Sequence, residues 1–256
     1  MTSIRSIILL LSLINAFPTA SKAEDDMDNM DVNEMIARAN ENTTSHLTFG
    51  DIAPTLQRNA DPCTATGCKW PKTGGFVYIP VDISRSYSSA QRRIIIDGLV
   101  SFYQETCIRF RWRRRENRNF LYFFSGSGCW SYLGRQSRGQ AISLQSNGCL
   151  FLGTVQHEVL HALGFHHEQV RSDRDEHVTI QFDNIIAGTE GNFQKVNTNN
   201  LGTLYDFDSV MHYSNRAFSK NGLPTIVANS NPNLSFGRAR EMSSNDIARI
   251  NELYDC

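Results

Sequence analysis

Eleven residues in the middle of the chain, His157 to His167, have the types and spacing of a metal site with its own base. On a helix, His157 and His161 lie one turn apart on the same face, where two imidazoles can bind one zinc ion. Glu158 can take a proton from a metal-bound water. Gly164 can end the helix and turn the chain back, so that His167 arrives as a third ligand. Three protein ligands leave one position for water, which is typical of a catalytic zinc.

The short pattern His-Glu-x-x-His also fits an ordinary helix with two surface histidines. Its continuation to His167 favours the metal site, because it matches the long zinc motif of metzincin proteases. Residues 152–164 are mostly apolar and contain no proline, so we expect a buried helix. The spacing from Gly164 selects His167 over His166, which we expect to be a packing residue.

The first 58 residues differ in composition from the rest of the chain. Arg5 precedes the apolar run 7–14, and small residues continue to Ala23, so residues 1–23 have the pattern of a secretory signal peptide. No later stretch reaches about 18 apolar residues, so we expect a secreted protein without a membrane span. Residues 24–58 are acidic and suit either a disordered tail or a pro-segment. A plausible cleavage site between Arg58 and Asn59 favours a pro-segment.

Cleavage at Arg58 would leave a catalytic domain of 198 residues, 59–256, from the 256 of the full chain. That domain has 21 basic and 18 acidic residues, and its net charge of +3 is too small to predict nucleic-acid binding. All six cysteines lie in it, which in a secreted chain predicts three disulfides; spacing alone does not choose among 15 connectivities. Asn42 and Asn233 are glycosylation candidates.

Hydrophobic patterning predicts an α+β domain around the zinc helix. Strands are expected where apolar side chains alternate or cluster, and helices where they recur every three to four residues. A last helix is expected to be capped by Ser243 or Ser244. The expected elements are a strand over 76–81, a helix over 88–106, strands over 107–115, 119–124 and 140–144, the zinc helix over 152–164, and the capped final helix.

Two longer stretches resemble the astacin family of metzincin zinc endopeptidases. Residues 157–175 read HEVLHALGFHHEQVRSDRD, and Ser209-Val-Met-His-Tyr213 resembles the family's methionine turn. The resemblance covers essentially all of residues 59–256. It implies a two-lobed α+β domain with a twisted sheet and two long helices in the first lobe. The second lobe would be mostly irregular with a final helix, and the zinc cleft would lie between the lobes.

The resemblance also implies a role for each matching residue. His157, His161 and His167 would bind one Zn²⁺, and Glu158 would be the general base. Tyr213 would be a switchable zinc ligand that swings away to stabilise the oxyanion. Other implied roles are a hydrophobic floor from Met211, anchoring of the new amino terminus at Asn59 by Glu168, and zinc binding by Asp51 in the latent form. Asp51 follows Phe49-Gly50, whereas the family pattern Phe-x-Gly-Asp puts the aromatic residue one place earlier.

The cysteines resemble those of the six-cysteine astacins of bony fishes, which include hatching enzymes (choriolysins) and related egg proteases. The resemblance implies disulfides Cys107–Cys256, Cys129–Cys149 and the extra pair Cys63–Cys68. It also suggests an egg-envelope or extracellular matrix protein as substrate, a trypsin-like activating protease, a monomer, and storage in secretory granules. Limited processing of one substrate, a catalytically silent binding protein and a zinc amidase are the alternatives.

Two features depart from that resemblance. Hatching enzymes carry Gly-x-Arg before the last helix, but here Ala239 stands at the arginine position, between Arg238 and Arg240. The second feature is a run of arginines over 109–118. A solvated strand face explains the run, and so does docking to an acidic or glycosylated matrix.

Overall fold

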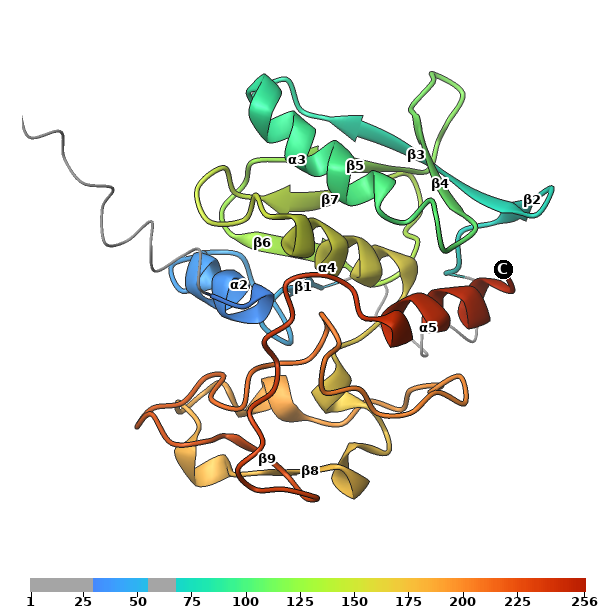
Figure 1. Cartoon of the computed structure of the whole chain (residues 1–256). Helices are drawn as coiled ribbons and strands as arrows, with labels where there is room; N and C mark the ends of the chain where they lie inside the picture. Colours follow the sequence, from blue (N-terminus) through green and yellow to red (C-terminus); the bar gives the residue numbers. More distant parts are fainter. Residues whose placement is uncertain (1–29, 55–67) are drawn as a thin grey trace, which may run out of the picture. The chain divides into compact units, whose positions relative to one another are not determined.

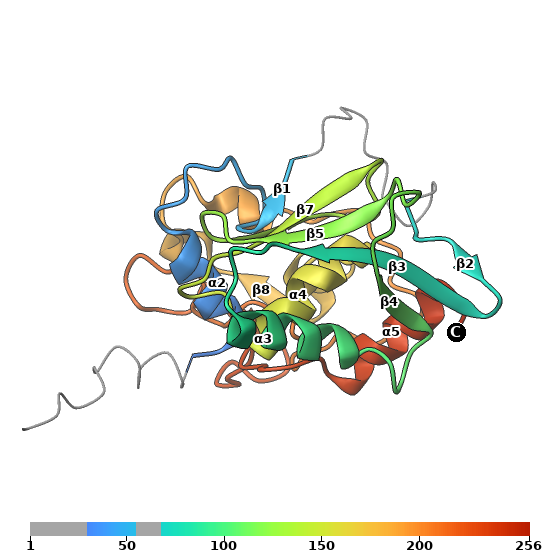
Figure 2. The same ribbon diagram turned by 90° about the horizontal axis from the view of Figure 1, so that it is seen from above.

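A seven-stranded mixed sheet forms the first half of the structured chain (Figure 1). The structure is a computed structural model that describes residues 30–54 and 68–256. The strand order is β1-β6-β7-β5-β3-β2, and β4 pairs with β3; Figure 2 shows β7, β5 and β3 side by side. The strands are β1 (Ile52–Ala53), β2 (Lys72–Thr73), β3 (Phe76–Ile83), β4 (Ile108–Trp112), β5 (Phe120–Phe124), β6 (Cys129–Tyr132) and β7 (Gly139–Leu144).

Alternating burial along the strands gives this sheet one core face and one solvent face. Val77 and Ile79 of β3 are fully buried, as are Leu121 and Phe123 of β5. Strand β3 runs parallel to both β4 and β5, with Val77 opposite Ile108 at the start of the β3–β4 pairing. The outward positions of these strands therefore form one continuous surface.

Two 12-residue helices, α3 (Ser89–Val100) and α4 (Leu152–Leu163), pack against each other, and α4 also contacts β6 and β7. Gly98 allows the helices to approach closely, because a Cβ there would lie 2.6 Å from a methyl carbon of Val155. Ser88 caps α3 through a capping box with Gln91. The expected extension of this helix to Thr106 is wrong. The chain turns after Val100, where the Ser101 hydroxyl donates to the Gly98 carbonyl and competes with further helical turns.

The second half of the chain is mostly irregular, as the sequence predicts, and lies below α4 in Figure 1. Its regular elements are a two-stranded antiparallel sheet of β8 (Val178–Ile180) and β9 (Ile226–Ala228) and four 3-10 turns at Glu168–Val170, Arg174–Glu176, Phe182–Asn184 and Glu190–Phe193. A separate apolar cluster that includes Phe193, Tyr205 and Phe236 holds this half together. The final helix α5 (Ser244–Tyr254) is capped by Ser243, one of the two predicted caps.

Two disulfides join distant parts of the chain. Cys107, just before β4, pairs with the C-terminal Cys256, and Cys129 of β6 pairs with Cys149 before α4. Both pairs match those that the family resemblance implied. The third expected pair involves Cys63, which lies outside the described residues.

Residues 30–54 contain two elements that sequence reasoning did not predict, helix α2 (Val32–Asn40) and strand β1. A stripe of Val32, Met35 and Ile36 is buried, and α2 packs on α4. The pairing of β1 with β6 extends the sheet by one strand. This acidic segment is too poor in apolar residues to form a core alone, but a three-residue stripe suffices against a core that already exists. Within the described ranges, no helix has the length and apolar character needed to cross a membrane.

Candidate metal and catalytic site

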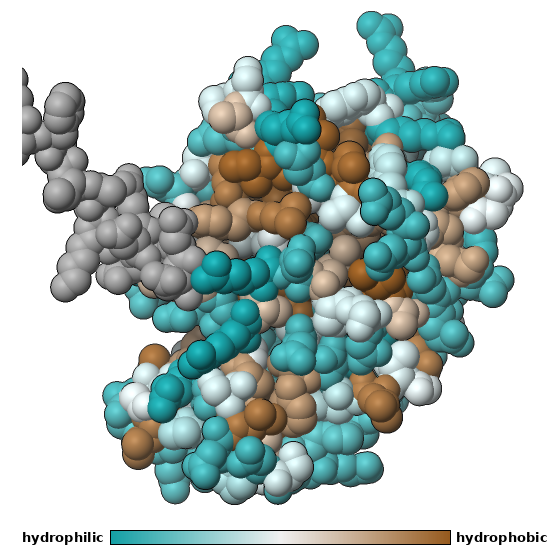
Figure 3. Space-filling model, in the orientation of Figure 1, coloured by the Kyte–Doolittle hydropathy of each residue, from teal (hydrophilic) through white to brown (hydrophobic). Residues whose placement is uncertain are grey.

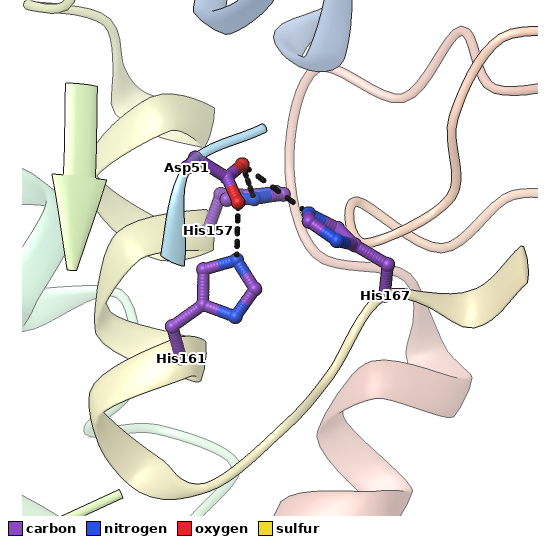
Figure 4. Close-up of side chains that lie close together, drawn as sticks. All are labelled: Asp51, His157, His161 and His167. Atoms are coloured by element: carbon purple, nitrogen blue, oxygen red, sulfur yellow. Dashed lines mark hydrogen bonds and ion pairs between the residues drawn. The ribbon is translucent and has the colours of Figure 1, made fainter. Parts of the chain in front are cut away.

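Three histidines and one aspartate converge in the interior (Figure 4). His157 and His161 come from α4, His167 follows α4, and Asp51 precedes β1. The Nε2 atoms of His157 and His167 lie 3.0 and 3.2 Å from Asp51 Oδ2, and that of His161 lies 3.3 Å from Oδ1. All four residues are buried, at 1 % exposure or less. The structure thus brings together the three predicted zinc ligands and the predicted latency ligand.

Backbone geometry explains how residues from separate elements reach one point. Gly164 ends α4 with φ of 113°, a left-handed conformation that favours glycine, and its N–H donates to the carbonyls of Leu160 and His161. The chain then turns back and brings His167 to the open side of α4. On the opposite side, Phe49 and Gly50 both have positive φ, at 51° and 85°, and this turn directs Asp51 at the histidines. His166 packs edge-on against Phe49, with ring centroids 5.6 Å apart.

Hydrogen bonds behind the histidines orient them as metal ligands. Nδ1 of His157 lies 2.9 Å from the carbonyl oxygen of Val210, and Nδ1 of His161 lies 2.7 Å from that of Phe165. A carbonyl can only accept, so each Nδ1 carries the proton and each Nε2 presents a lone pair. These lone pairs face the carboxylate of Asp51. Lone pairs opposed in this way repel each other unless a cation lies among them.

The donor set fits zinc. Imidazole nitrogen and carboxylate oxygen are both zinc ligands, and four tetrahedral donors at about 2.0–2.1 Å from the ion lie about 3.3 Å from one another. The 3.0–3.3 Å distances between Asp51 and the histidines agree with that spacing. Asp51 Oδ1 and His161 Nε2 are buried without a hydrogen-bond partner in the described structure, as expected of atoms that bind a metal.

Charge and burial act in opposite directions on Asp51. Burial alone would raise its pKa, but positive charge on His167 and His161 outweighs burial and holds the pKa of this carboxyl well below its usual range, and a cation bound among the histidines would act in the same direction. Glu158, fully buried on α4, differs because neither carboxylate oxygen has a hydrogen-bond partner among the described residues. Burial, and then the charge of Asp51, raise the pKa of Glu158 well above normal. A carboxyl in such a place can take up and release a proton.

Tyr213 and Met211 lie where the motif comparison puts them. The ring of Tyr213 lies beside His167, with centroids 4.7 Å apart, and its hydroxyl donates to the carbonyl oxygen of Phe49 at 2.5 Å. The same turn that directs Asp51 therefore also holds the hydroxyl of Tyr213. Met211 is buried, and its carbonyl accepts from the N–H of Glu168 at 2.9 Å, which links the methionine turn to the segment after His167.

Glu168 is buried in an ion-pair network that sequence reasoning missed. Arg249 of α5 binds its carboxylate with two hydrogen bonds of 2.7 Å, and Arg171 adds a third at 3.3 Å. The Asp206 N–H also donates to it, at 2.7 Å. Asn59, its predicted partner, lies outside the described residues, so the anchoring role stays a prediction. No pattern within residues 168–249 indicated the Glu168–Arg249 pair, because 81 positions separate its members.

Two asparagines of α2 were also missed. Asn33 donates to the carbonyls of Val210 and His212 at 3.1 and 2.8 Å, and the first of these also accepts from the ligand His157. Asn40 donates to the Gly50 carbonyl at 2.9 Å and exchanges two further 2.8 Å bonds with Cys129. The two side chains therefore tie α2 to the methionine turn and to the turn that bears Asp51. Polar residues of these types occur throughout the segment, so no sequence signal singles them out.

A pocket of about 330 Å³ adjoins the site and is lined in part by Asp51, Tyr213 and Arg238. Asp31, which caps α2, and Glu34 of α2 also line it. Ala239 accepts a hydrogen bond from Val32 through its carbonyl, so the segment that departs from the hatching-enzyme pattern contacts α2 directly. Arg240 and the two glycosylation candidates, Asn42 and Asn233, are exposed.

Comparison with known proteins identifies the class to which this fold and site belong. Residues 64–255 match the family model described as "Astacin", a peptidase family. The chain therefore belongs to the astacin family and is a zinc metalloendopeptidase. The resemblance seen in the sequence is confirmed, as are the fold class and the zinc cofactor.

Hatching enzymes are among its similar relatives. The chain is 43 % identical over 234 residues to "High choriolytic enzyme 1" of Oryzias latipes, which covers 91 % of this chain and 86 % of that protein. Its identity to "Low choriolytic enzyme" of the same fish is 40 % over 262 residues, covering 98 % and 96 %. The solved structure of the first, described as a hatching enzyme zinc-protease, aligns with a TM-score of 0.73 at 44 % identity, covering 77 % of this chain and all of that one.

Proposed function

We propose that this endopeptidase is secreted as a zymogen and, once activated, cleaves egg-envelope or other extracellular proteins, with Glu158 as general base. The single observation that carries the proposal is the closure of the buried histidine cluster by Asp51, a residue of the acidic segment before Arg58. A latent enzyme needs its catalytic site closed by a group that can be removed, and the carboxylate of Asp51 belongs to a segment that cleavage would release.

The chemistry of the activated form follows from the side chains around the cluster. His157, His161 and His167 would hold the zinc, which when bound supplies a water nucleophile near neutral pH and polarises the scissile carbonyl. Glu158 accepts the proton of the attacking water and then gives it to the leaving amine, for which its buried carboxyl with a raised pKa is suited. Tyr213, once free of the Phe49 carbonyl, can donate a hydrogen bond from its hydroxyl to the developing oxyanion.

In the latent form, the segment before Arg58 would block both the position of the catalytic water and the hydroxyl of Tyr213. Asp51 takes the position that the catalytic water would need, and the Phe49 carbonyl holds the hydroxyl of Tyr213. Asn33 and Asn40 attach α2 to the methionine turn and to the Asp51 turn. Cleavage between Arg58 and Asn59 by a trypsin-like protease would release the segment. Asn59 could then reach Glu168, which in the described structure is neutralised by Arg249 and Arg171.

Secretion and substrate class rest on sequence and relatives. The signal-peptide pattern of residues 1–23, the disulfides, and the exposed glycosylation candidates Asn42 and Asn233 support an extracellular protein. The choriolytic names of its relatives support an egg-envelope substrate. We further infer that the chain acts as a monomer and that granules store it before release.

The test of the catalytic assignment is Glu158→Gln in the activated form. The amide keeps the shape of the side chain but cannot accept the proton, so casein digestion should fall by a factor of roughly 100–10,000. Zinc content, measured by atomic absorption, should stay at one per chain. Glu252→Gln, an exposed change on α5, is the matched control and should digest casein normally. A Glu158→Gln enzyme that digests casein at the unaltered rate would overturn the assignment, and a chelator should abolish digestion in every active form.

A further inference from the structure

A row of arginines lies on the solvent face of the sheet, away from the zinc site. Arg109, Arg111 and Arg113 alternate along β4 and just beyond it, and we call these three residues the arginine ladder. Alternate residues of a strand share one face and repeat about every 6.6–6.8 Å. The ladder is therefore a regular array of three positive charges rather than a scattered group.

Aromatic rings hold the ladder in place. The guanidinium carbon of Arg111 lies 3.3 Å from the centroid of Tyr78, and that of Arg113 lies 3.6 Å from that of Phe120. Arg109 lies 4.6 Å over Phe76. Stacking immobilises a guanidinium without using its in-plane N–H groups, which can bind a carboxylate with two hydrogen bonds. In Arg109 one nitrogen already donates to the carbonyls of Thr106 and Ile108, so its remaining N–H groups are the ones that can bind an anion. The ladder has thus already lost part of the side-chain freedom that binding an anion would otherwise cost.

The charge of this region is not neutralised nearby. In the described structure Arg113 has one carboxylate partner, Asp82, at a distant 3.8 Å. The following turn adds Arg114, Arg115 and Arg118, all exposed, and only one acid, Glu116. A surface with such an excess of one sign attracts segments of the opposite sign over about a Debye length.

The same face also exposes apolar surface. Phe76 and Tyr122 are 37 % and 36 % exposed, and Tyr122 stacks on Phe124. Figure 3 shows the molecule from the side on which α3 and α4 lie in front of the sheet, with hydrophilic groups projecting from its upper edge. A solvated strand needs charge but has no need of exposed aromatic rings beside it. Aromatic and arginine side chains together are typical of protein-binding surfaces.

We propose that the arginine ladder is a substrate-docking site that binds an extended acidic segment of the protein substrate, outside the catalytic cleft. An extended chain presents alternate side chains with the same repeat as β4, so Asp or Glu at every second position can meet successive arginines. The aromatic rings contact the residues between them. Docking of this kind raises the local concentration of cleavable bonds without any change in the chemistry.

The docked segment lies on the face of the sheet, not along its edge. Strand β4 pairs only with β3 among the described strands, so its other edge could in principle accept a further strand. Tyr103 blocks that edge at its centre, because its hydroxyl donates to the Phe110 carbonyl at 2.6 Å and accepts from the Phe110 N–H at 3.0 Å. Recognition therefore depends on side chains, and it selects a segment by the spacing of its acidic residues.

The binding test uses the full, uncleaved chain, in which the ladder is exposed, and so does not depend on catalysis. Two fluorescent ten-residue peptides, one alternating Glu and Thr and one alternating Gln and Thr, are titrated by anisotropy at 50 mM and 500 mM salt. The Glu peptide should bind about tenfold more tightly than the Gln peptide at low salt, since each exposed Arg–carboxylate pair contributes only a little. The preference should vanish at high salt.

Two triple variants separate the ladder from net charge. Arg109→Gln/Arg111→Gln/Arg113→Gln should lose the preference for the Glu peptide. Arg93→Gln/Lys195→Gln/Lys220→Gln removes the same charge from other elements and should keep it. Equal binding by both variants would overturn the proposal. So would competition by heparin without any binding of the Glu peptide, because the ligand would then be a polysaccharide.

A kinetic arm tests whether the docked segment belongs to a substrate. The two peptide sequences are fused to one cleavable reporter and given to the activated enzyme. The acidic fusion should have a kcat/KM about tenfold above the neutral fusion, and the ladder variant should reduce that ratio to about one. Binding without any gain in kcat/KM would show that the segment is not part of a substrate and would refute the proposal.

Discussion

The histidine cluster and the arginine ladder are both made of side chains that regular secondary structure places on one face, but their surroundings are opposite. His157 and His161 are spaced by a helical turn and are buried with Asp51. Arg109, Arg111 and Arg113 are spaced by alternate strand positions and face water, with one distant carboxylate partner among the described residues. The same regularity thus creates a closed site in one region and an open one in the other.

The difference teaches how environment sets the size and sensitivity of electrostatic effects. In a buried site of low dielectric each partner matters strongly, and removing one leaves an uncompensated charge. On the surface, water and salt weaken each pair, and only several pairs together select a ligand. We therefore expect single changes at the cluster to act strongly, and single changes at the ladder to act weakly and in proportion to their number.

The largest effect should come from Asp51→Ala in the uncleaved chain, with Arg58→Gln to prevent activation. Losing one partner of a buried charged set costs about 3–5 kcal/mol, so basal cleavage of a quenched peptide should rise by a factor of roughly 100 or more. Glu41→Ala, an exposed change in the same segment, is the control and should stay latent. An Asp51→Ala chain as silent as its parent would remove the carboxylate from the latency mechanism.

Tyr213→Phe should lower kcat of the activated enzyme by roughly 100-fold with little change in KM, because the lost hydroxyl acts only in the transition state. Tyr254→Phe is the matched control, since it also deletes a buried hydroxyl, one that donates to the Leu163 carbonyl at 2.8 Å. Steady-state kinetics on one peptide measure both. A similar fall in both variants would attribute the loss to stability rather than to the oxyanion.

A smaller effect, on the unfolding free energy, is expected at Asp31. This carboxylate is buried like Asp51 but has no cluster of histidines around it in the described structure. Burial raises the pKa of Asp31 from 3.8 to about 6. Because the folded pKa is the higher one, the stabilisation is complete below about pH 4 and is lost as pH rises through 6. Between pH 4 and 7 the unfolding free energy of the native chain should fall by about 1–3 kcal/mol relative to Asp31→Asn, which stays neutral.

Chemical denaturation at each pH measures this difference. Zinc binding and histidine titration affect both chains alike, so the difference between the chains isolates Asp31. A pH-independent difference would mean that Asp31 has the same pKa in the folded and unfolded chains, which would contradict a pKa raised by burial.

The smallest effect should be found at the ladder. Arg111→Ala loses one stacked guanidinium, which at an exposed site contributes about 0.5–1 kcal/mol to the free energy of unfolding. Arg118→Ala, in the exposed turn, should change it by less than about 0.5 kcal/mol. Urea denaturation of the full chain compares the two. A loss above about 3 kcal/mol at Arg111 would contradict the view of the ladder as an open surface.

Sequence reasoning predicted the elements whose signals are local. The histidine spacing, Gly164 as the helix stop, the cap at Ser243, and strands β3, β4, β5 and β7 all depend on neighbours within a few residues. It failed at the end of α3, where the apolar pattern continues to Thr106 but the hydrogen bond of the Ser101 hydroxyl competes with further helical turns. It also missed α2, because a nine-residue helix with three buried apolar side chains is not stable without the surface that covers it.

By itself the sequence determined the chemistry of this protein: which residues can bind zinc, which carboxylate can act as base, and which family the motifs belong to. Only the tertiary structure decided what surrounds them. It brings Asp51 across 106 positions to His157, pairs Arg249 with Glu168, and lays aromatic rings beneath the arginines of β4. The physical reason is that ligand spacing follows from the repeat of one helix, whereas burial, the approach of Asp51 and stacking depend on contacts between segments that are distant in the chain.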